Sequence, residues 1–194
     1  IPKPQNSSFE EAAAVPLGGL NALHFMRLAN IQTGDKVLVN GAGGSIGTFG
    51  VQIAKDMGAE VTAVDSRIKE DMLRRIGADH FIDYTRQDFT KLGQKYDVIF
   101  DMVAGSSYSG CIRSLKPDGR YLKGNPRLSD MIRAFLTTRL TGRTASCAFA
   151  RETVEELLTL KQMIEDNRIK PVMDRCYPPE HANEAHQRVE TEQR

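Results

Sequence analysis

From residue 36 onward, short apolar runs alternate with stretches of helical periodicity, and this alternation limits the fold more than any other feature of the chain. The runs are rich in β-branched or aromatic residues and are bounded by Gly, Asp or Pro, which is typical of buried strands. They lie at residues 36–40, 60–65, 80–84, 96–103, 119–124 and 146–150. Strands that alternate with helices are joined by right-handed crossovers into a parallel sheet with helices on both faces. The sequence therefore predicts a doubly wound α/β fold with six strands.

Two helical segments lie outside this alternation. Residues 8–30 predict a helix that Ser8 caps and that is interrupted near Pro16, Gly18 and Gly19. Residues 151–169 predict a long amphipathic helix after the sixth strand. With 194 residues, of which 40% are apolar, we expect one compact domain with a single core.

The charge balance and the cysteines exclude several classes of partner and site. Lys and Arg number 26 against 25 Asp and Glu, so neither nucleic acid nor a membrane is expected as a partner. Cys111, Cys147 and Cys176 are odd in number and widely spaced, which predicts reduced thiols rather than a disulfide framework or a C-x-x-C metal pair. No apolar run approaches the ~20 residues that cross a bilayer, and the N-terminal stretch has no signal-peptide core. These features predict a cytoplasmic protein.

A glycine-rich turn separates the first strand from the next helix, in KVLVNGAGGSIGTFGVQIAK, residues 36–55. Ala42, Gly44 and Gly47 match the dinucleotide fingerprint G-x-G-x-x-G, with Ala in the first place. In that motif a bare backbone approaches a pyrophosphate, and the helix N-terminus directs its free N–H groups at it. The next strand ends at Asp65, about twenty residues on, where a carboxylate can bind the ribose hydroxyls of an adenosine. We interpret the turn as a dinucleotide-binding site.

The sequence leaves the choice between NAD and NADP open. The carboxylate of Asp65 favours NAD(H), because its charge repels a 2′-phosphate. Ser66 and Arg67 follow immediately, and a hydroxyl beside a guanidinium is suited to bind that phosphate. The two signals point to different coenzymes.

Several stretches, taken in order, resemble the coenzyme-binding domain of the medium-chain dehydrogenases/reductases, in the zinc-independent quinone oxidoreductase-like branch. They are AAAVPLGGLNAL, GDKVLVNGAGGSIGTFGVQIAK, GAEVTAVDS, LRRIGADHFIDY, YDVIFDMVAG and LKPDGRYLKGN. The resemblance implies a Rossmann sheet with strand order 3-2-1-4-5-6. It also implies that residues 1–34 are a linker and leading helix from a catalytic domain absent from this chain, and that residues 35–194 form the dinucleotide-binding domain.

The same resemblance implies which residues contact the coenzyme, most of them at the carboxyl ends of strands. Those at the pyrophosphate are Gly44, Ser45 and Ile46, within the fingerprint Ala42 to Gly47. Those at the adenosine are Asp65, Ser66, Arg67 and Tyr84, and those on the nicotinamide side are Val103, Ala104, Gly124 and Asn125. No catalytic residue and no metal ligand is assigned within this chain.

The family implies an NAD(P)H-dependent oxidoreductase that transfers hydride to a quinone, an enone or a similar activated double bond. The chain alone is expected to bind the dinucleotide and to catalyse little, because the substrate cleft of the family lies between two domains. A homodimer is expected through the sheet edge near residues 146–150. Two alternatives remain open. One is an S-adenosylmethionine-dependent methyltransferase, which would end its sheet in a reversed hairpin, and the other is a non-catalytic dinucleotide-sensing domain.

Overall fold

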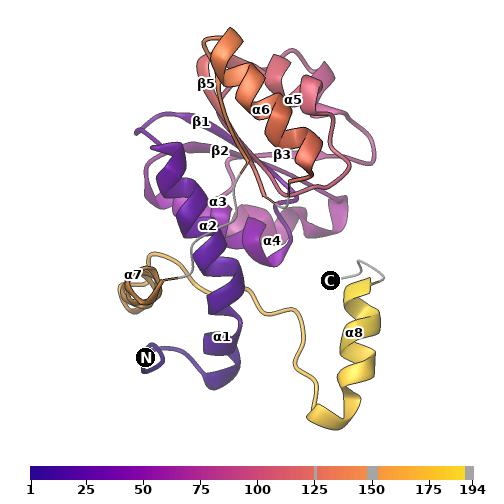
Figure 1. Ribbon diagram of the computed structural model, residues 1–194. Helices are drawn as coiled ribbons and strands as arrows, with labels where there is room; N and C mark the ends of the chain where they lie inside the picture. The colour runs from indigo at the N-terminus through magenta and orange to yellow at the C-terminus, as the bar shows by residue number, and fades with distance from the viewer. Residues whose placement is uncertain (125, 148–152, 191–194) are drawn as a thin grey trace.

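Six parallel strands form the central sheet of the computed structural model, which describes residues 1–124, 126–147 and 153–190 (Figure 1). The strands are β1 (Lys36–Asn40), β2 (Glu60–Asp65), β3 (His80–Asp83), β4 (Tyr96–Asp101), β5 (Leu115–Lys123) and β6 (Thr144–Cys147). Their order is β3-β2-β1-β4-β5-β6, and each neighbouring pair is parallel. The predicted fold class and strand order are confirmed. The parallel β5–β6 pair also disfavours the methyltransferase alternative, which requires a reversed hairpin at this edge.

Helices cover both faces of the sheet (Figure 1). On one face lie α2 (Val15–Ala29), α3 (Ser45–Asp56), α4 (Glu70–Arg75) and α7 (Val154–Glu165), whose buried side chains join one apolar cluster with β1 and β2. On the other face lie α5 (Tyr108–Arg113) and α6 (Leu128–Leu140), which are linked by a hydrogen bond between the Tyr108 hydroxyl and Thr137. The short helix α1 (Phe9–Ala13), the 3₁₀ turns η1 (Arg67–Lys69), η2 (Phe89–Lys91) and η3 (Pro179–His181), and α8 (Ala182–Glu190) complete the described elements.

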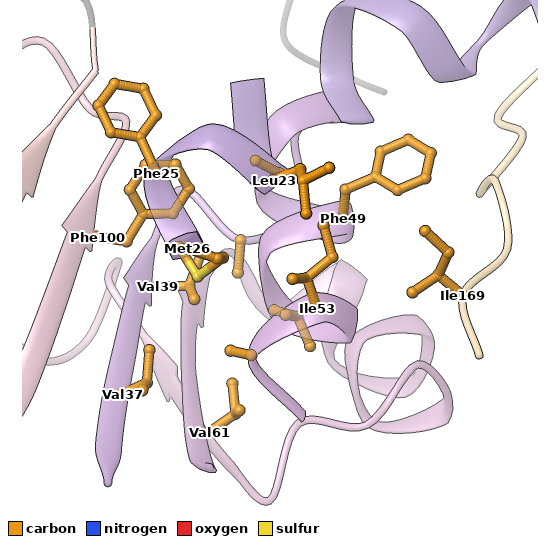
Figure 2. Packing of buried hydrophobic residues seen from close by; sticks show 14 of the residues in the cluster. Leu23, Phe25, Met26, Val37, Val39, Phe49, Ile53, Val61, Phe100 and Ile169 are labelled. Carbon is orange, nitrogen blue, oxygen red and sulfur yellow. The ribbon is translucent and has the colours of Figure 1, made fainter. Parts of the chain in front are cut away.

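The larger core lies between α2, α3 and the sheet (Figure 2). Phe25 and Met26 of α2 pack against β-strand residues such as Val39 and Phe100, and Phe25 and Phe100 have ring centroids 5.3 Å apart. α2 therefore shares its core with the sheet, on both sides of the predicted boundary between residues 34 and 35. The assignment of residues 1–34 to a segment arriving from another domain stays a prediction.

The leading helix differs from the sequence-based expectation at its interruption. Ser8 caps α1 as predicted, because its hydroxyl accepts from the Glu11 N–H at 3.2 Å. The break comes at Ala14, however, and Pro16 lies in the first turn of α2, where its missing N–H costs no hydrogen bond. Gly18 lies within α2, where a Cβ would be 2.7 Å from the carbonyl oxygen of Ser45. This glycine lets α2 approach the start of α3 closely and does not end a helix.

The outer strand β6 begins at Thr144, two residues before the predicted start. It pairs with β5 over Arg120 to Lys123. The remainder of the predicted strand, residues 148–150, lies outside the described residues.

Candidate functional site

The turn between β1 and α3 is built from backbone groups that approach one another closely. Gly41 has φ +82°, a conformation that favours glycine, and the N–H groups of Gly41 and Ala42 both donate to the Val64 carbonyl at 3.1 Å. A Cβ on Gly47 would lie 2.2 Å from the Gly41 oxygen and 2.7 Å from Ala42 Cα. Gly47 is thus required for packing of α3 against the turn. At Gly44 such a Cβ would lie 3.6 Å from the Gly41 carbonyl oxygen, an ordinary van der Waals contact, so packing within the turn does not itself require glycine there.

The N-terminus of α3 is open to a ligand. Gly44 is its N-cap, and no side chain among the described residues caps the helix. The first N–H groups of a helix have no partner within it, and the dipole of this 12-residue helix adds partial positive charge there. Ser45 is exposed and Ile46 is half-buried at this end. A glycine-lined, uncapped helix start fits a diphosphate, so the residues present fit the predicted dinucleotide.

Asp65, the last residue of β2, lies directly against the glycine turn. Its Oδ2 accepts from the Gly43 N–H at 2.7 Å, and its Oδ1 accepts from the Ser66 N–H at 2.8 Å. The Lys69 ammonium lies 3.4 Å from Oδ1 and also 3.4 Å from the Gly43 carbonyl oxygen. The Ser66 hydroxyl also donates to Oδ1 at 3.4 Å. The carboxylate is therefore already bound by four donors from the chain itself.

Lys69 is a site residue that the sequence analysis missed. It belongs to η1, four residues after Asp65, and its side chain is 15% exposed, so it packs over the turn rather than extending into water. A Cβ on Gly43 would lie 2.2 Å from Lys69 Cδ, which shows how closely the lysine stem covers that glycine. The i, i+4 spacing between Asp65 and Lys69 was visible in the sequence. It indicates a site residue only once the structure places the Lys69 side chain over the glycine turn.

The other residues predicted at the adenosine gather at the same end of the sheet. The Tyr84 N–H donates to the Asp65 carbonyl at 3.2 Å, and Tyr84 is 58% exposed. Arg67 is largely exposed, with its guanidinium 3.0 Å from the Glu70 carboxylate. Ser66 is half-buried beside Asp65. An exposed aromatic ring, two cations and a hydroxyl therefore surround the end of β2.

The residues predicted on the nicotinamide side are only partly brought together. Val103 is 40% exposed, and a Cβ on Gly41 would lie 3.2 Å from its Cγ2, so it adjoins the glycine turn. Ala104 is exposed in the loop after β4. Gly124 is buried against Met102, whose sulfur would be 2.5 Å from a Cβ there. Asn125 lies outside the described residues.

A buried ion pair lies beneath this loop, and no pattern in the sequence predicted it. Asp101 ends β4 and is fully buried, and Lys123 ends β5 at 2% exposure, with 3.2 Å between Oδ2 and the ammonium. The Asp101 carboxylate also accepts from Asn40 Nδ2 at 2.9 Å and from the Tyr121 hydroxyl at 2.7 Å. Such a pair is satisfied on nearly every side, as burial of charge requires.

The same pair holds the loop that follows β4. The Val103 N–H donates to Asp101 Oδ1 at 3.1 Å, and the Val103 carbonyl accepts from the Lys123 ammonium at 3.3 Å. Ser106, farther along the loop, donates to Asp101 and contacts the ammonium at 3.1 Å. Both backbone polar groups of a predicted nicotinamide residue are thus fixed by one ion pair.

Other chemistry is sparse in the described part of the chain. No group of three or more His, Cys, Asp or Glu there could hold a metal ion. Two surface hollows, one of about 500 Å³ lined by residues such as Gln52 and Arg168, the other by residues such as Pro4 and Leu157, include none of the predicted site residues. No described helix is long and apolar enough to span a bilayer.

Comparison with known proteins identifies the group to which these features belong. The family model described as zinc-binding dehydrogenase matches residues 76–194, more than half of the chain. A 2-methylene-furan-3-one reductase from Solanum lycopersicum is 31% identical over 177 residues, which cover 89% of this chain and 41% of that protein.

Solved structures agree. The quinone oxidoreductase from Coxiella burnetii superposes with a TM-score of 0.88 at 27% identity, covering 98% of this chain and 60% of that one. A structure described as an NAD-dependent alcohol dehydrogenase gives a TM-score of 0.84 at 29% identity, covering 98% and 58%. The chain therefore spans 41% to 60% of the length of these relatives.

Proposed function

The chain belongs to the zinc-binding dehydrogenase family, as a coenzyme-binding domain of the medium-chain dehydrogenases/reductases, and from this premise we propose that it binds NADP(H) for a reductase of quinones, enones or similar activated double bonds. The observation that carries the proposal is the uncapped start of α3 beside the Asp65–Lys69 pair. The nicotinamide supplies the hydride when it is bound. The residues of this chain bind and orient it.

The proposed pose assigns the pyrophosphate to the turn. Gly44 leaves room for the phosphate oxygens, and the N–H groups of Ser45 and Ile46 donate to them. The exposed ring of Tyr84 packs beside the adenosine. Val103 and Ala104 lie along the nicotinamide, with Val103 held against Gly41. Gly124 and Asn125 complete this side in the proposal.

The preference for NADP(H) follows from the charges at the end of β2. Asp65 already accepts hydrogen bonds from Gly43 and Ser66 and pairs with Lys69, which offsets its repulsion of a 2′-phosphate. Lys69 and Arg67 place two cations beside the Ser66 hydroxyl, a donor set suited to a phosphate. We infer that the phosphate replaces Asp65 as a partner of the Lys69 ammonium.

Calorimetric titration of the chain with NADPH and NADH at fixed salt tests this proposal. We expect NADPH to bind at least about tenfold more tightly, a difference of about 1.4 kcal/mol, and Lys69→Met to remove most of that difference. Lys91→Met is the matched control, because Lys91 is an exposed lysine of η2 that pairs with Asp88. Tighter NADH binding that is unchanged in Lys69→Met would make Asp65 the ribose anchor. A folded chain that binds neither coenzyme would contradict the proposed function.

The activity is proposed for the full-length parent, since the chain spans only part of its relatives. The reductase named above acts on a conjugated enone according to its name, and the quinone oxidoreductase on a quinone, which supports this substrate class. A non-catalytic dinucleotide-sensing domain predicts the same coenzyme titration. Oxidation of NADPH by the parent in the presence of a quinone or enone separates the two, because a sensing domain would show no substrate-dependent oxidation.

Three further features of the proposal concern the parent. We propose that it works without zinc, as in the branch that the sequence resembles, and metal analysis of the purified parent tests this. A homodimer through the edge near residues 146–150 is proposed because β6 is the outer strand and an open edge favours pairing. Sedimentation at micromolar concentrations distinguishes dimer from monomer. A cytoplasmic location stays a prediction.

A further inference from the structure

The side of helix α6 that faces the body of the protein carries polar or small residues. Ala134 is buried, and the Thr137 hydroxyl hydrogen-bonds the Tyr108 hydroxyl of α5, which lies beside α6, at 2.9 Å (Figure 1). The Thr138 hydroxyl accepts from the Ala145 N–H of β6 at 3.0 Å. Thr137 therefore marks the flank of α6 toward α5, and Thr138 marks the flank toward the outer strand β6.

The large apolar residues of α6 lie on the remaining sides of the helix and are exposed. They are Leu128, Met131, Ile132, Phe135, Leu136 and Leu140, with exposed fractions between 44% and 78%. Met131 and Phe135 come seven and three residues before Thr138, so they share its flank. Leu136 and Leu140 lie on the opposite flank, about 160° around the helix from Thr138. The flank toward β6 is therefore apolar, and a contiguous exposed apolar patch marks an interaction site.

The same flank borders the outer edge of the sheet and covers part of it. Among the strands that the structure describes, β6 pairs with β5 alone. The Ala145 N–H already donates to Thr138, so it is not free to pair with a strand of another chain. A stable interface buries about 800 Å² on each partner, far more than the edge of one short strand supplies. The homodimer proposed above therefore needs a contact besides strand pairing.

We propose that α6 supplies this contact, and that its flank toward β6 packs against the same flank of a second copy of the chain. The inference rests on the homodimer proposed above. In a twofold dimer one patch meets its own copy, so an apolar patch is covered by an apolar patch. With the axis perpendicular to the sheet, the two α6 helices lie on the same face of the joined sheets and run antiparallel beside the outer strands. Met131 and Phe135 of each copy then lie between the helices, where packing removes apolar surface from water.

Three arginines of α6 and the turn after it leave the flank free for such a contact. The Arg143 guanidinium turns inward, 3.5 Å from the Leu115 carbonyl oxygen. Arg133 lies on the flank toward α5. The Arg139 guanidinium lies 5.5 Å from the centre of the Phe135 ring, so it covers one side of that ring while its charge stays in water at the rim of the contact.

Sedimentation of the 194-residue chain at micromolar concentrations tests the proposal. We expect the wild type to dimerise, and the double variant Met131→Ser/Phe135→Ser to raise the dissociation constant of the dimer at least about tenfold. Leu136→Ser/Leu140→Ser is the matched control, because it removes two exposed apolar residues from the opposite flank of the same helix and should leave that constant unchanged. Circular dichroism establishes that each variant is folded before the comparison.

Three results would overturn the proposal, and they differ in what they leave standing. Equal dissociation constants in the three chains would show that α6 lies outside the interface, while the homodimer through β6 would stand. Weakening by the control alone would place the contact on the other flank of α6. A wild-type chain that stays monomeric would contradict the homodimer and the α6 contact together, and would leave the flank to a part of the parent outside this chain.

Titration of the same samples with NADPH keeps this result apart from the proposed coenzyme site. The flank includes none of the residues proposed to contact the coenzyme, so both double variants should bind NADPH as the wild type does. A loss of binding in all three chains would contradict the coenzyme proposal and leave the sedimentation result unchanged.

Discussion

The Asp65–Lys69 pair and the Asp101–Lys123 pair both lie at the carboxyl edge of the sheet, but they differ in burial and in the number of groups that bind them. Asp65 and Lys69 retain 9% and 15% side-chain exposure at 3.4 Å. Asp101 and Lys123 retain 0% and 2% at 3.2 Å, and further hydrogen bonds surround the carboxylate. A pair that still touches solvent can exchange its partner for a ligand. A pair that is fully buried and bonded fixes the backbone around it.

The largest expected effect comes from removing charge at the buried pair. Asp101→Asn leaves the Lys123 ammonium buried without its counter-charge, and we expect it to lower the free energy of unfolding by about 3–5 kcal/mol. Lys69→Met, at the other pair, should cost clearly less, because Asp65 keeps the hydrogen bonds from the Gly43 and Ser66 N–H groups. Urea denaturation followed by circular dichroism measures both. Similar losses in the two variants would show that the pairs do not differ as described.

Two glycine variants of the turn between β1 and α3 separate the glycine that packing requires from the glycine that the coenzyme requires. Gly47→Ala places a Cβ 2.2 Å from the Gly41 carbonyl oxygen, so the backbone must shift, and we expect a loss of about 1–3 kcal/mol in stability. In Gly44→Ala the nearest atom is 3.6 Å away, and stability should change by less than about 1 kcal/mol. Under the proposed function, Gly44→Ala nevertheless weakens coenzyme binding. Normal NADPH binding by the Gly44→Ala variant would contradict the proposed placement of the pyrophosphate at Gly44.

We expect the Asp101–Lys123 pair to affect the binding of the nicotinamide half of the coenzyme and not that of the adenosine half. Lys123→Met removes the donor to the Val103 carbonyl while Asp101 keeps its bonds to Asn40 and Tyr121. Given the proposed pose, we expect NADPH to bind about tenfold more weakly, and 2′,5′-ADP, which lacks the nicotinamide, to bind as before. Calorimetry with the two ligands gives the ratio directly. An equal change for both ligands would mean that the pair acts on the domain as a whole.

A further expected effect is a loss of stability at alkaline pH that originates around the buried Asp101–Lys123 pair. Burial, followed by the nearby charge of Asp101, raises the pKa of the Cys111 thiol from 9.0 to about 12. A folded pKa above the unfolded one stabilises the fold fully below pH 9.0, and that contribution is lost as the pH rises toward 12. Burial also raises the pKa of Tyr121, which acts in the same direction.

Unfolding free energies measured between pH 8 and 11 in a native and a Cys111→Ala chain test this assignment, since the decline should begin near the ordinary thiol pKa of 9.0. The decline should be shallower in Cys111→Ala and unchanged in the control Cys176→Ala, whose thiol is exposed. Parallel curves for native and Cys111→Ala chains would place the alkaline sensitivity elsewhere.

Local patterns in the sequence were enough to predict the main elements. β1 and β2 agree with the predicted runs residue for residue, because a buried parallel strand reads as a short apolar run bounded by turn residues. The alternation with helices predicted the doubly wound class, and the family resemblance implied the strand order that the sheet has. The fingerprint around Gly44 was visible because its chemistry depends on backbone and on neighbours within a few residues.

Only the tertiary structure decided which polar side chains meet and which face of a helix is covered. Asp101 and Lys123 are 22 residues apart and on adjacent strands, so no periodicity in the sequence links them. Lys69 reads as an ordinary helical charge until the turn lies beneath it. The alternation of strands and helices predicted a helix between the fifth and sixth strands, where α6 lies, but the spacing of apolar residues alone cannot tell an inward stripe from an outward one. That difference is set by what α6 packs against, and those contacts come from residues distant in the chain.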